Sequence, residues 1–249
     1  MKSRKLSTFL KETKYCNFNH PKIKNLVQKI VKSCISEREK VITVFNWVKE
    51  NIKFEFGYWG VDAVSTLKKR GGMCTNKSNL LIAFLRALKI PAGYGILKIN
   101  TSEFYGSLMC PLFKKLVSPK STHIYIGVFL EKKWIRCDPS LDNDLAEALK
   151  KKTPFSEFSG FDLKEKEIKK IKGVLERKEF LANIDKILSK PPKNLQRKTI
   201  KLLNQYLLFL RSNKKLIKKI STPKEMEKEF IEQLKKEQLP LFKFFEKKL

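Results

Sequence analysis

One cysteine in the sequence stands where a thiol can become reactive. Cys74 follows two glycines, Gly71 and Gly72, and begins an apolar run whose spacing predicts a helix. At the N-terminus of a helix, unpaired backbone amides and the positive end of the dipole favour the thiolate, which is the nucleophilic form of cysteine. The glycines allow a sharp turn and leave room for a substrate chain beside the sulfur. We therefore predict Cys74 as a nucleophile and Gly72 as part of a substrate-binding surface.

A thiolate nucleophile needs a base, and two later residues could supply one. His123 begins an alternating run that predicts a strand, and Asp138 ends the strand that returns after a turn. A carboxylate beside an imidazole can orient the ring and stabilise its cationic form. Taken singly, each residue has an ordinary explanation. Small cysteines are often buried, strand histidines are often half exposed, and Asp before Pro is common in turns.

The predicted hairpin leaves one difficulty. With a two-residue turn at Lys132–Lys133, Asp138 lies opposite Gly127, on the same face as His123 but four residues from it. Contact between His123 and Asp138 then requires a bulge, a wider turn or a bent strand.

Periodicity predicts the elements that position these side chains. They are two helices within 21–52 with a capping box at Ser36 and Glu39, a short helix at 62–69, a helix over 74–89, a strand at 93–99 and a hairpin of 122–130 and 134–138. Residues 100–121 are expected to be an irregular connection, and residues 144–249 carry helical patterns without strand signals. The sequence thus predicts an α+β core over residues 1–145 and an all-helical basic extension over residues 146–249.

Two motifs carry a family resemblance. "GGMCTNKSNLLIAFLRALKIPAGY" resembles the catalytic helix of the transglutaminase-like superfamily, and "HIYIGVFLEKKWIRCDPS" is similar to the family's second block, in which His opens a strand and Asp-Pro-Ser/Thr closes the hairpin. The resemblance extends over roughly residues 20–142. Lys89 and Gly93 depart from the family pattern without removing a catalytic atom.

The resemblance implies a papain-like α+β fold, with N-terminal helices packed on an antiparallel sheet. It also implies a triad of Cys74 as nucleophile, His123 as base and Asp138 as the orienting carboxylate. The implied chemistry is acyl transfer on a protein or peptide substrate through a thioester at Cys74, resolved by water or by an amine. In related members, calcium sites accompany crosslinking and CxxC zinc sites accompany deglycosylation. The chain has neither an acidic calcium loop nor a CxxC pair, so we expect hydrolysis of a peptide or isopeptide bond.

The backbone amide of Cys74 could form half of an oxyanion hole, but the second donor is not evident from sequence. Trp47, Tyr58 and Trp59 are candidates, and each could equally belong to the core. Tyr58 and Trp59 lie in a glycine-flanked loop, and we predict that both contact substrate.

The composition indicates which kinds of stabilising group, cofactor and partner the chain can have. The five cysteines include no CxxC pair, and only two histidines are present, so we predict neither a disulfide framework nor a metal or other cofactor. The net charge is +29, and Lys186 to Lys224 holds twelve basic residues and no acidic one. This stretch could bind an acidic protein or nucleic acid, or be a solvated face around the apolar stripe Ile200, Leu203, Tyr206, Leu207 and Leu210.

Three functional hypotheses follow. The first is the cysteine enzyme. The second is a catalytically silent scaffold, because some members of the superfamily lack the triad and bind damaged DNA; the presence of Cys74, His123 and Asp138 together favours the enzyme. The third makes residues 186–249 a docking or autoinhibitory element over the cleft, which sequence does not separate from structural padding. No apolar stretch approaches the ~20 residues of a membrane span, and no signal peptide is apparent, so we predict a cytoplasmic location.

Overall fold

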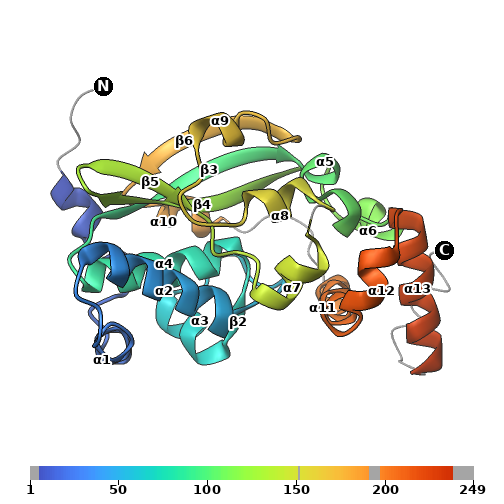
Figure 1. Cartoon of the computed structure of the whole chain (residues 1–249), viewed down its shortest axis with the longest axis horizontal. Coiled ribbons are helices and arrows are strands. Elements are labelled where there is room, and N and C mark those ends of the chain that lie inside the picture. The colour runs from blue at the N-terminus through green and yellow to red at the C-terminus, as the bar shows by residue number, and fades with distance from the viewer. Residues whose placement is uncertain (1–5, 151, 191–196, 238–249) are drawn as a thin grey trace.

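The computed structural model describes residues 6–150, 152–190 and 197–237. A curled four-stranded sheet carries a layer of helices, α1 to α4, on one side (Figure 1). A further group of helices, α11 to α13, gathers at one end of the sheet. Within the described residues, no helix combines the length and apolar character needed to span a membrane.

The N-terminal helical layer confirms the predicted helices. After a 3₁₀ helix, η1 (Leu6–Leu10), come α1 (Pro21–Ile30), α2 (Glu37–Asn51), α3 (Ala63–Lys69) and α4 (Cys74–Ala87). The predicted capping box is present, because the Ser36 side chain accepts from Glu39 N and the Glu39 side chain accepts from Ser36 N. Helix α4 is the central element, with every residue from Cys74 to Arg86 buried. It packs against the sheet and against α1, α2 and α3.

The main sheet is antiparallel with the strand order β5-β4-β3-β6. Its strands are β3 (Ala92–Asn100), β4 (Lys120–Leu130), β5 (Lys133–Cys137) and β6 (Val174–Leu181). A two-residue parallel pair, β1 (Lys53–Phe54) with β2 (Gly71–Gly72), lies next to the start of α4. The α+β class and the packing of N-terminal helices on an antiparallel sheet are thereby confirmed.

The hairpin turn lies one residue earlier than predicted. Leu130 pairs with Lys133, and the two turn residues, Glu131 and Lys132, both have positive φ (51° and 60°). Such a turn matches the twist of the flanking strands. The sequence gives no sign of it, because it has neither Asn nor Gly at these two positions.

The connection at 100–121 contains helices, contrary to expectation. They are α5 (Thr101–Tyr105), the 3₁₀ turn η2 (Gly106–Leu108) and α6 (Pro111–Leu116). Asn100 caps α5 by accepting a hydrogen bond from Glu103 N, and Pro111 occupies the first turn of α6. These start signals are local, but the helices are too short to show periodicity.

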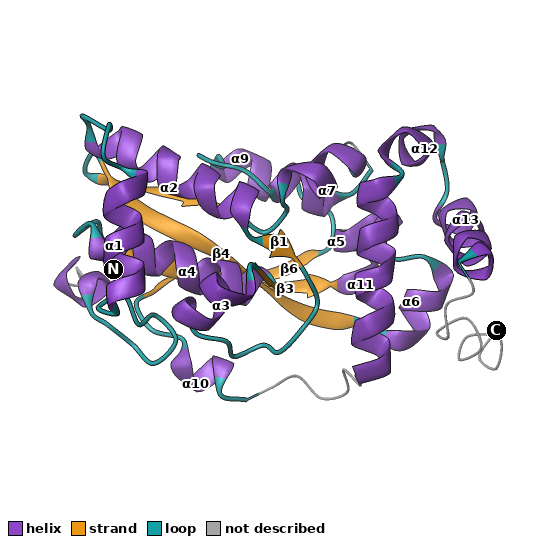
Figure 2. Ribbon diagram, turned by 90° about the horizontal axis from the view of Figure 1, so that it is seen from below, coloured by secondary structure: helices purple, strands orange, loops and turns teal. Residues whose placement is uncertain are grey.

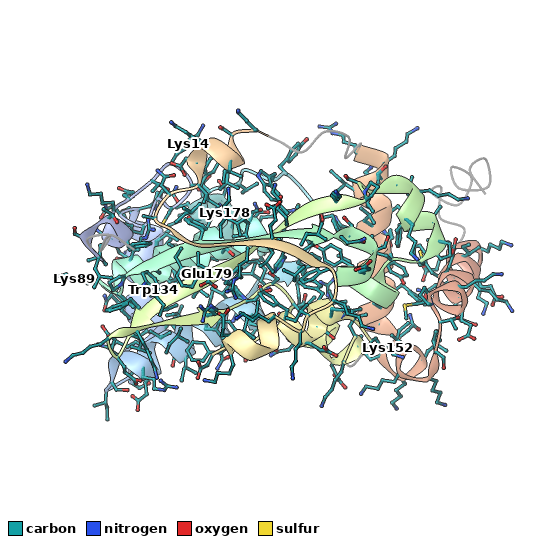
Figure 3. The ribbon with its side chains drawn as sticks, turned by 90° about the horizontal axis from the view of Figure 1, so that it is seen from above. Lys14, Lys89, Trp134, Lys152, Lys178 and Glu179 are labelled. Carbon is teal, nitrogen blue, oxygen red and sulfur yellow. The ribbon has the colours of Figure 1, made fainter. Side chains whose placement is uncertain are left out.

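The expectation that residues 146–249 form only helices is wrong in one element. Strand β6 pairs antiparallel with β3, so this region completes the core sheet. Its sequence, VLERKEFL, does not alternate between apolar and polar residues, because β6 is an edge strand whose Glu179 forms an ion pair with Arg136 of β5. Figure 3 shows Glu179 and Lys178 on β6 near Trp134 of β5. Whether the chain divides near residue 145 into two folding units stays a prediction.

The remaining elements are helical, as predicted. They are α7 (Asn143–Ala148), α8 (Pro154–Phe158), α9 (Glu165–Ile168), α10 (Asp185–Leu188), α11 (Arg197–Ser212), α12 (Lys214–Lys219) and α13 (Pro223–Lys236). The apolar stripe of α11 faces inward: Leu203, Tyr206, Leu207 and Leu210 are buried, and Ile200 is half buried. Figure 2 shows α11 at the end of the sheet near α5 and α6. Residues 191–196 of the predicted basic region lie outside the described residues.

Candidate functional site

Cys74 is the first residue of α4, as predicted, and only 3% of it is exposed. The start of the helix is held by its neighbour Asn76, whose Oδ1 accepts from Met73 N at 3.0 Å. The Asn76 Nδ2 and the Thr75 hydroxyl both donate to the carbonyl of Trp59, each at 3.0 Å. The loop that carries Trp59 is therefore tied to the helix turn that carries Cys74.

The two glycines before Cys74 are needed for close packing. A Cβ on Gly72 would lie 2.7 Å from the Cβ of Asn76, and one on Gly71 would lie 2.5 Å from a carboxylate oxygen of Glu55. Gly72 also pairs with Phe54 across β1 and β2. The glycines thus bring β2 against the helix start. The predicted contact of Gly72 with substrate stays a prediction, and Gly72 is not among the residues that line the cavity described below.

His123 and Asp138 meet. His123 Nε2 lies 2.7 Å from Asp138 Oδ2, and both residues are fully buried. The earlier turn reduces the offset between them, because continued pairing would place Asp138 opposite Tyr125 rather than Gly127. The chain also leaves β4 after Cys137: Cys137 pairs with Phe161, and Asp138 N donates to Gly160 O at 2.7 Å. This bend brings the Asp138 carboxylate to the His123 ring.

The Asp138 carboxylate is held from its other side by Ser140. Asp138 Oδ1 accepts from Ser140 N at 2.9 Å and also from the Ser140 hydroxyl. An Asp that accepts from the backbone two residues later forms an Asx turn, so the sequence Asp138-Pro139-Ser140 carried a local signal for this contact. Sequence reasoning had assigned no role to Ser140.

An aromatic cage surrounds the imidazole. The ring of His123 lies 5.3 Å from those of Phe104 and Phe155 and 5.6 Å from that of Phe158, measured between centroids. Phe104 belongs to α5, and the other two belong to α8. The rings shield the bond between His123 and Asp138 from water. No sequence signal marked these residues, because they come from segments far from His123 in the chain.

The electrostatics of the site favour a charged imidazole. Burial favours the neutral ring, but the Asp138 carboxylate and the nearby Cys74 thiol favour the cation more strongly, and together they raise the pKa of His123 to about 10. An ionised carboxylate only accepts, so Nε2 carries the proton shared with Asp138. The second ring nitrogen, Nδ1, has no hydrogen-bond partner among the described residues. Nδ1 is therefore the nitrogen available to the Cys74 thiol.

A cavity of about 880 Å³ reaches Cys74. Trp59 lines it too, and its indole N–H is buried without a hydrogen-bond partner in the described part of the chain. Tyr58 is 70% exposed and is not among the lining residues, so the structure does not bring its side chain to Cys74. Trp47 packs against Phe84 instead, outside the lining. His123 is buried and does not itself line the cavity.

The described residues contain no cluster of three or more His, Cys, Asp or Glu side chains suited to hold a metal ion. Part of the basic region is already paired within the chain. Arg211 binds Asp142, Lys214 binds Asp144 and Glu147, and Lys218 binds Glu147. Binding of an acidic protein or nucleic acid by the residues 186–224 stays a prediction.

Residues 24–139 match the family model of the transglutaminase-like superfamily. Among solved structures, a proposed cysteine protease from Cytophaga hutchinsonii shares 21% identity over 63% of this chain and 45% of its own, with a TM-score of 0.44. The periplasmic domain of TgpA from Pseudomonas aeruginosa, solved with ethylmercury, shares 16% identity over 53% of this chain and 47% of its own, with a TM-score of 0.35.

This chain spans less than half the length of each of these two structures, and no curated protein matches it. The family match covers α4 with Cys74 and the hairpin with His123 and Asp138. It ends before α8, β6 and α11. Residues 24–139 are thus similar to the transglutaminase-like superfamily, and this similarity covers all three residues of the candidate triad.

Proposed function

We propose that the protein is a cysteine hydrolase that cleaves peptide or isopeptide bonds through a thioester at Cys74. One observation carries the proposal. His123 is hydrogen-bonded to Asp138 through Nε2, while Nδ1 has no hydrogen-bond partner among the described residues. Cys74 is close enough to contribute to the raised pKa of His123. A base oriented by a carboxylate beside a thiol at a helix start is the arrangement that activates a cysteine nucleophile.

The reaction proceeds in two stages. The proton of the Cys74 thiol resides on His123 Nδ1 when the sulfur attacks the carbonyl carbon of the scissile amide. His123 then returns the proton to the nitrogen of the departing amine, the carbon–nitrogen bond breaks, and the acyl group stays on sulfur as a thioester. In the second stage His123 accepts a proton from water, hydroxide attacks the thioester, and the carboxylic acid leaves as sulfur recovers its proton.

The oxyanion formed at each stage would rest on two N–H groups. The backbone amide of Cys74 stands in the first turn of α4, where amides have no partner within the helix. The indole N–H of Trp59, which lines the same cavity and has no partner in the described structure, is the second donor. The bonds from Thr75 and Asn76 to the Trp59 carbonyl hold the two donors together.

Replacing Trp59 with phenylalanine tests this second donor. We expect kcat to fall by about 10²–10³-fold with little change in KM, because the indole N–H would act mainly on the transition state. Alkylation of Cys74 by iodoacetamide, which forms no oxyanion, should keep its wild-type rate. Trp47→Phe is the matched control and should leave kcat unchanged. A Trp59→Phe enzyme with unaltered kcat would remove Trp59 from the mechanism.

The pH profile of hydrolysis should depend on Asp138. The folded pKa of His123 is raised, so its proton is present below about pH 10 and is lost above it. Because His123 must protonate the leaving amine, kcat/KM should decline as the pH rises through about 10. Asp138→Asn removes the charge that holds the pKa up, so the decline should begin at lower pH. The control Asp144→Asn removes an exposed carboxylate, and an identical shift in both variants would contradict the assignment.

Alkylation mapped by mass spectrometry tests the proposed function directly. At neutral pH we expect iodoacetamide to label Cys74 selectively in the wild type and to lose this selectivity in His123→Ala. Burial raises the pKa of Cys16 and of Cys110 to about 12, and burial raises that of Cys137 further, so these thiols should stay unreactive. Equal labelling of all five cysteines, or none at Cys74, would refute the proposal.

We infer hydrolysis, with water as the acceptor, over crosslinking to an amine. The inference rests on the sequence, which contains no acidic calcium loop of the kind that accompanies crosslinking in related members. The test is to follow the products of a peptide amide with and without an added primary amine. Amine incorporation that exceeds release of the free acid would assign the protein to the crosslinking group instead.

A further inference from the structure

Most of the described residues that line the cavity at Cys74 lie within the family match, and five come from elements that follow it. Helix α11 forms one wall, supplying Leu203, Tyr206 and Leu207. It is fixed to the loop that follows β1, because Asn204 accepts from Phe56 N at 2.8 Å and donates to Phe56 O at 3.0 Å. Arg211 adds a bond of 2.6 Å to Phe54 O. These contacts make α11 a permanent wall of the cleft.

The lining has a consistent chemistry. Its interior is apolar and aromatic, with the following side chains among those that face the cavity: Phe54, Phe56, Trp59, Leu108, Met109 and Phe113. Within the described part of the chain, every charged lining residue is a lysine, namely Lys98, Lys115, Lys120 or Lys190. All four are exposed. Apolar surface favours an apolar ligand group, and a rim that carries only positive charges favours a negatively charged ligand.

Two of the lysines are positioned to act together. Lys98 pairs in register with Thr122 and Asn100 pairs with Lys120, so Lys98 and Lys120 stand diagonally on the same face of neighbouring strands. Diagonal positions are about 7–8 Å apart. Lys115 follows from α6 and Lys190 from the segment after α10, so the positive charge comes from four different parts of the chain.

The cavity at Cys74 is large enough to hold more than one side chain of a bound peptide. Pockets of about 300–1,000 Å³ hold whole drug-sized ligands, and this cavity is near the upper end of that range at about 880 Å³. A polyanion such as DNA needs charge along a surface and little apolar volume. A deep apolar cavity with a cationic rim fits instead a chain that carries bulky apolar groups next to carboxylates.

We propose that the cleft selects peptides in which large apolar residues near the acyl carbon are flanked by acidic residues. The apolar side chains occupy the cavity between α11 and the Phe54–Phe56 segment, and the carboxylates pair with Lys98 and Lys120. This specificity rests on the proposed function, since the acyl carbon is the one that Cys74 attacks. It assigns α11 to substrate recognition.

Binding to the full-length Cys74→Ala protein tests this specificity without turnover. The probes are dye-labelled peptides of one length around a Leu-Phe-Gln centre, with either Glu or Lys flanks, and a third with Glu flanks and Ser-Ser-Gln at the centre. By fluorescence anisotropy we expect the Glu-flanked apolar peptide to bind at least about tenfold more tightly than either other peptide, with an affinity that falls as salt screens the lysines. Equal binding of all three would overturn the proposal.

Charge reversal locates the binding surface. In Lys98→Glu/Lys120→Glu, affinity for the Glu-flanked peptide should fall by at least about tenfold and that for the Lys-flanked peptide should rise, because attraction and repulsion exchange. The matched control, Lys172→Glu/Lys178→Glu, changes the net charge equally on exposed positions outside the lining; Lys178 is marked on the outer strand in Figure 3. Equal losses in both double variants would show a general charge effect and refute the site.

Two further outcomes separate this inference from the proposed function. If wild-type Cys74 shows selective, His123-dependent alkylation while the peptides bind without preference, only the substrate specificity is wrong. If the peptide preference holds while Cys74 is not selectively alkylated, the hydrolase proposal is wrong. A single-stranded oligonucleotide should not displace the Glu-flanked peptide at moderate salt, and stoichiometric displacement would assign the cleft to nucleic acid instead.

Discussion

Replacing Cys74 with alanine is expected to lower kcat for peptide hydrolysis by on the order of 10⁴-fold or more, because no acyl group can then be held on the enzyme. His123→Ala should lose nearly as much, and the double variant should lose little beyond either single variant, since the two groups act as a unit. The measurement is kcat with a fluorogenic peptide of the Glu-flanked apolar type, together with an unfolding curve for each variant.

Cys34→Ala is the matched control for the first prediction. Cys34 is half buried, and its thiol donates to Thr43 between the first two helices, away from the cavity. Its replacement should leave kcat unchanged. Activity that survives in a folded Cys74→Ala protein would show that another group is the nucleophile, whereas loss of activity in Cys34→Ala would show that kcat is sensitive to any cysteine change.

Replacing Asp142 with alanine is expected to lower the free energy of unfolding by about 3–5 kcal/mol, because it removes one partner of a buried ion pair. Asp142 Oδ2 accepts from Arg211 Nη2 at 2.6 Å and from Phe54 N at 2.9 Å, and Oδ1 accepts from Leu145 N at 3.2 Å. The variant leaves the Arg211 charge and the Phe54 amide without this acceptor. The effect would be measured by urea denaturation at pH 7.

A buried lysine, Lys77, adds to the loss of stability expected in Asp142→Ala. Lys77 lies on α4 with its Nζ bonded to Ile52 O, and burial lowers its pKa to about 7, while the charges of Asp142 and Asp138 act in the opposite direction. Loss of Asp142 therefore makes a charged Lys77 less favourable. The expected loss of stability concerns the helix that carries Cys74 as well as the attachment of α11.

The pH dependence of this loss has a definite sign. Burial alone would raise the pKa of Asp142. The hydrogen bond from Arg211, the charge of Arg211 and the hydrogen bond from the Phe54 amide lower it by more, so the pKa in the folded protein lies below the ordinary value. The stabilisation is therefore complete above the ordinary aspartate pKa of ~4 and is lost as the pH falls through the folded value. The difference between wild type and Asp142→Ala should shrink in acid.

Glu147→Ala is the control for the second prediction. Glu147 of α7 pairs with Lys214 and Lys218 of the neighbouring α12, and these ion pairs are exposed to solvent. Screening by water makes such pairs weak, so the control should unfold close to wild type. If Asp142→Ala were no less stable than Glu147→Ala, the bond network around Asp142 would not be what holds α11 against the core.

These contacts also explain what the basic region does within the fold. Arg211, Lys214 and Lys218 belong to the predicted basic region, and each pairs with an acidic residue of α7 or of the turn that caps it. Among the described residues, the positive charge at the cavity comes mostly from other segments: Lys98, Lys115 and Lys120 precede the region, and Lys190 belongs to it.

Much of the site could be predicted from sequence because its signals are short. A glycine pair before a cysteine, a capping box at Ser36 and Glu39, and a histidine that opens an alternating run are all contained in windows of a few residues. Their structural consequences depend on backbone hydrogen bonds within those windows, so the sequence alone predicts Cys74 at a helix start and His123 in a strand. The Asx turn from Asp138 to Ser140 depends on an equally short window.

What these residues contact depends on how the whole chain packs. The one-residue shift of the turn to Glu131–Lys132, the departure of the chain after Cys137, the aromatic cage from α5 and α8, and the fourth strand β6 all involve partners distant in sequence. Such contacts form wherever packing buries the most apolar surface and satisfies the most polar groups, and no short window records that balance. Local patterns in the sequence are therefore enough to identify a candidate nucleophile and a candidate base. That α11, a helix outside the family match, forms one wall of the cavity beside them follows from packing between distant segments.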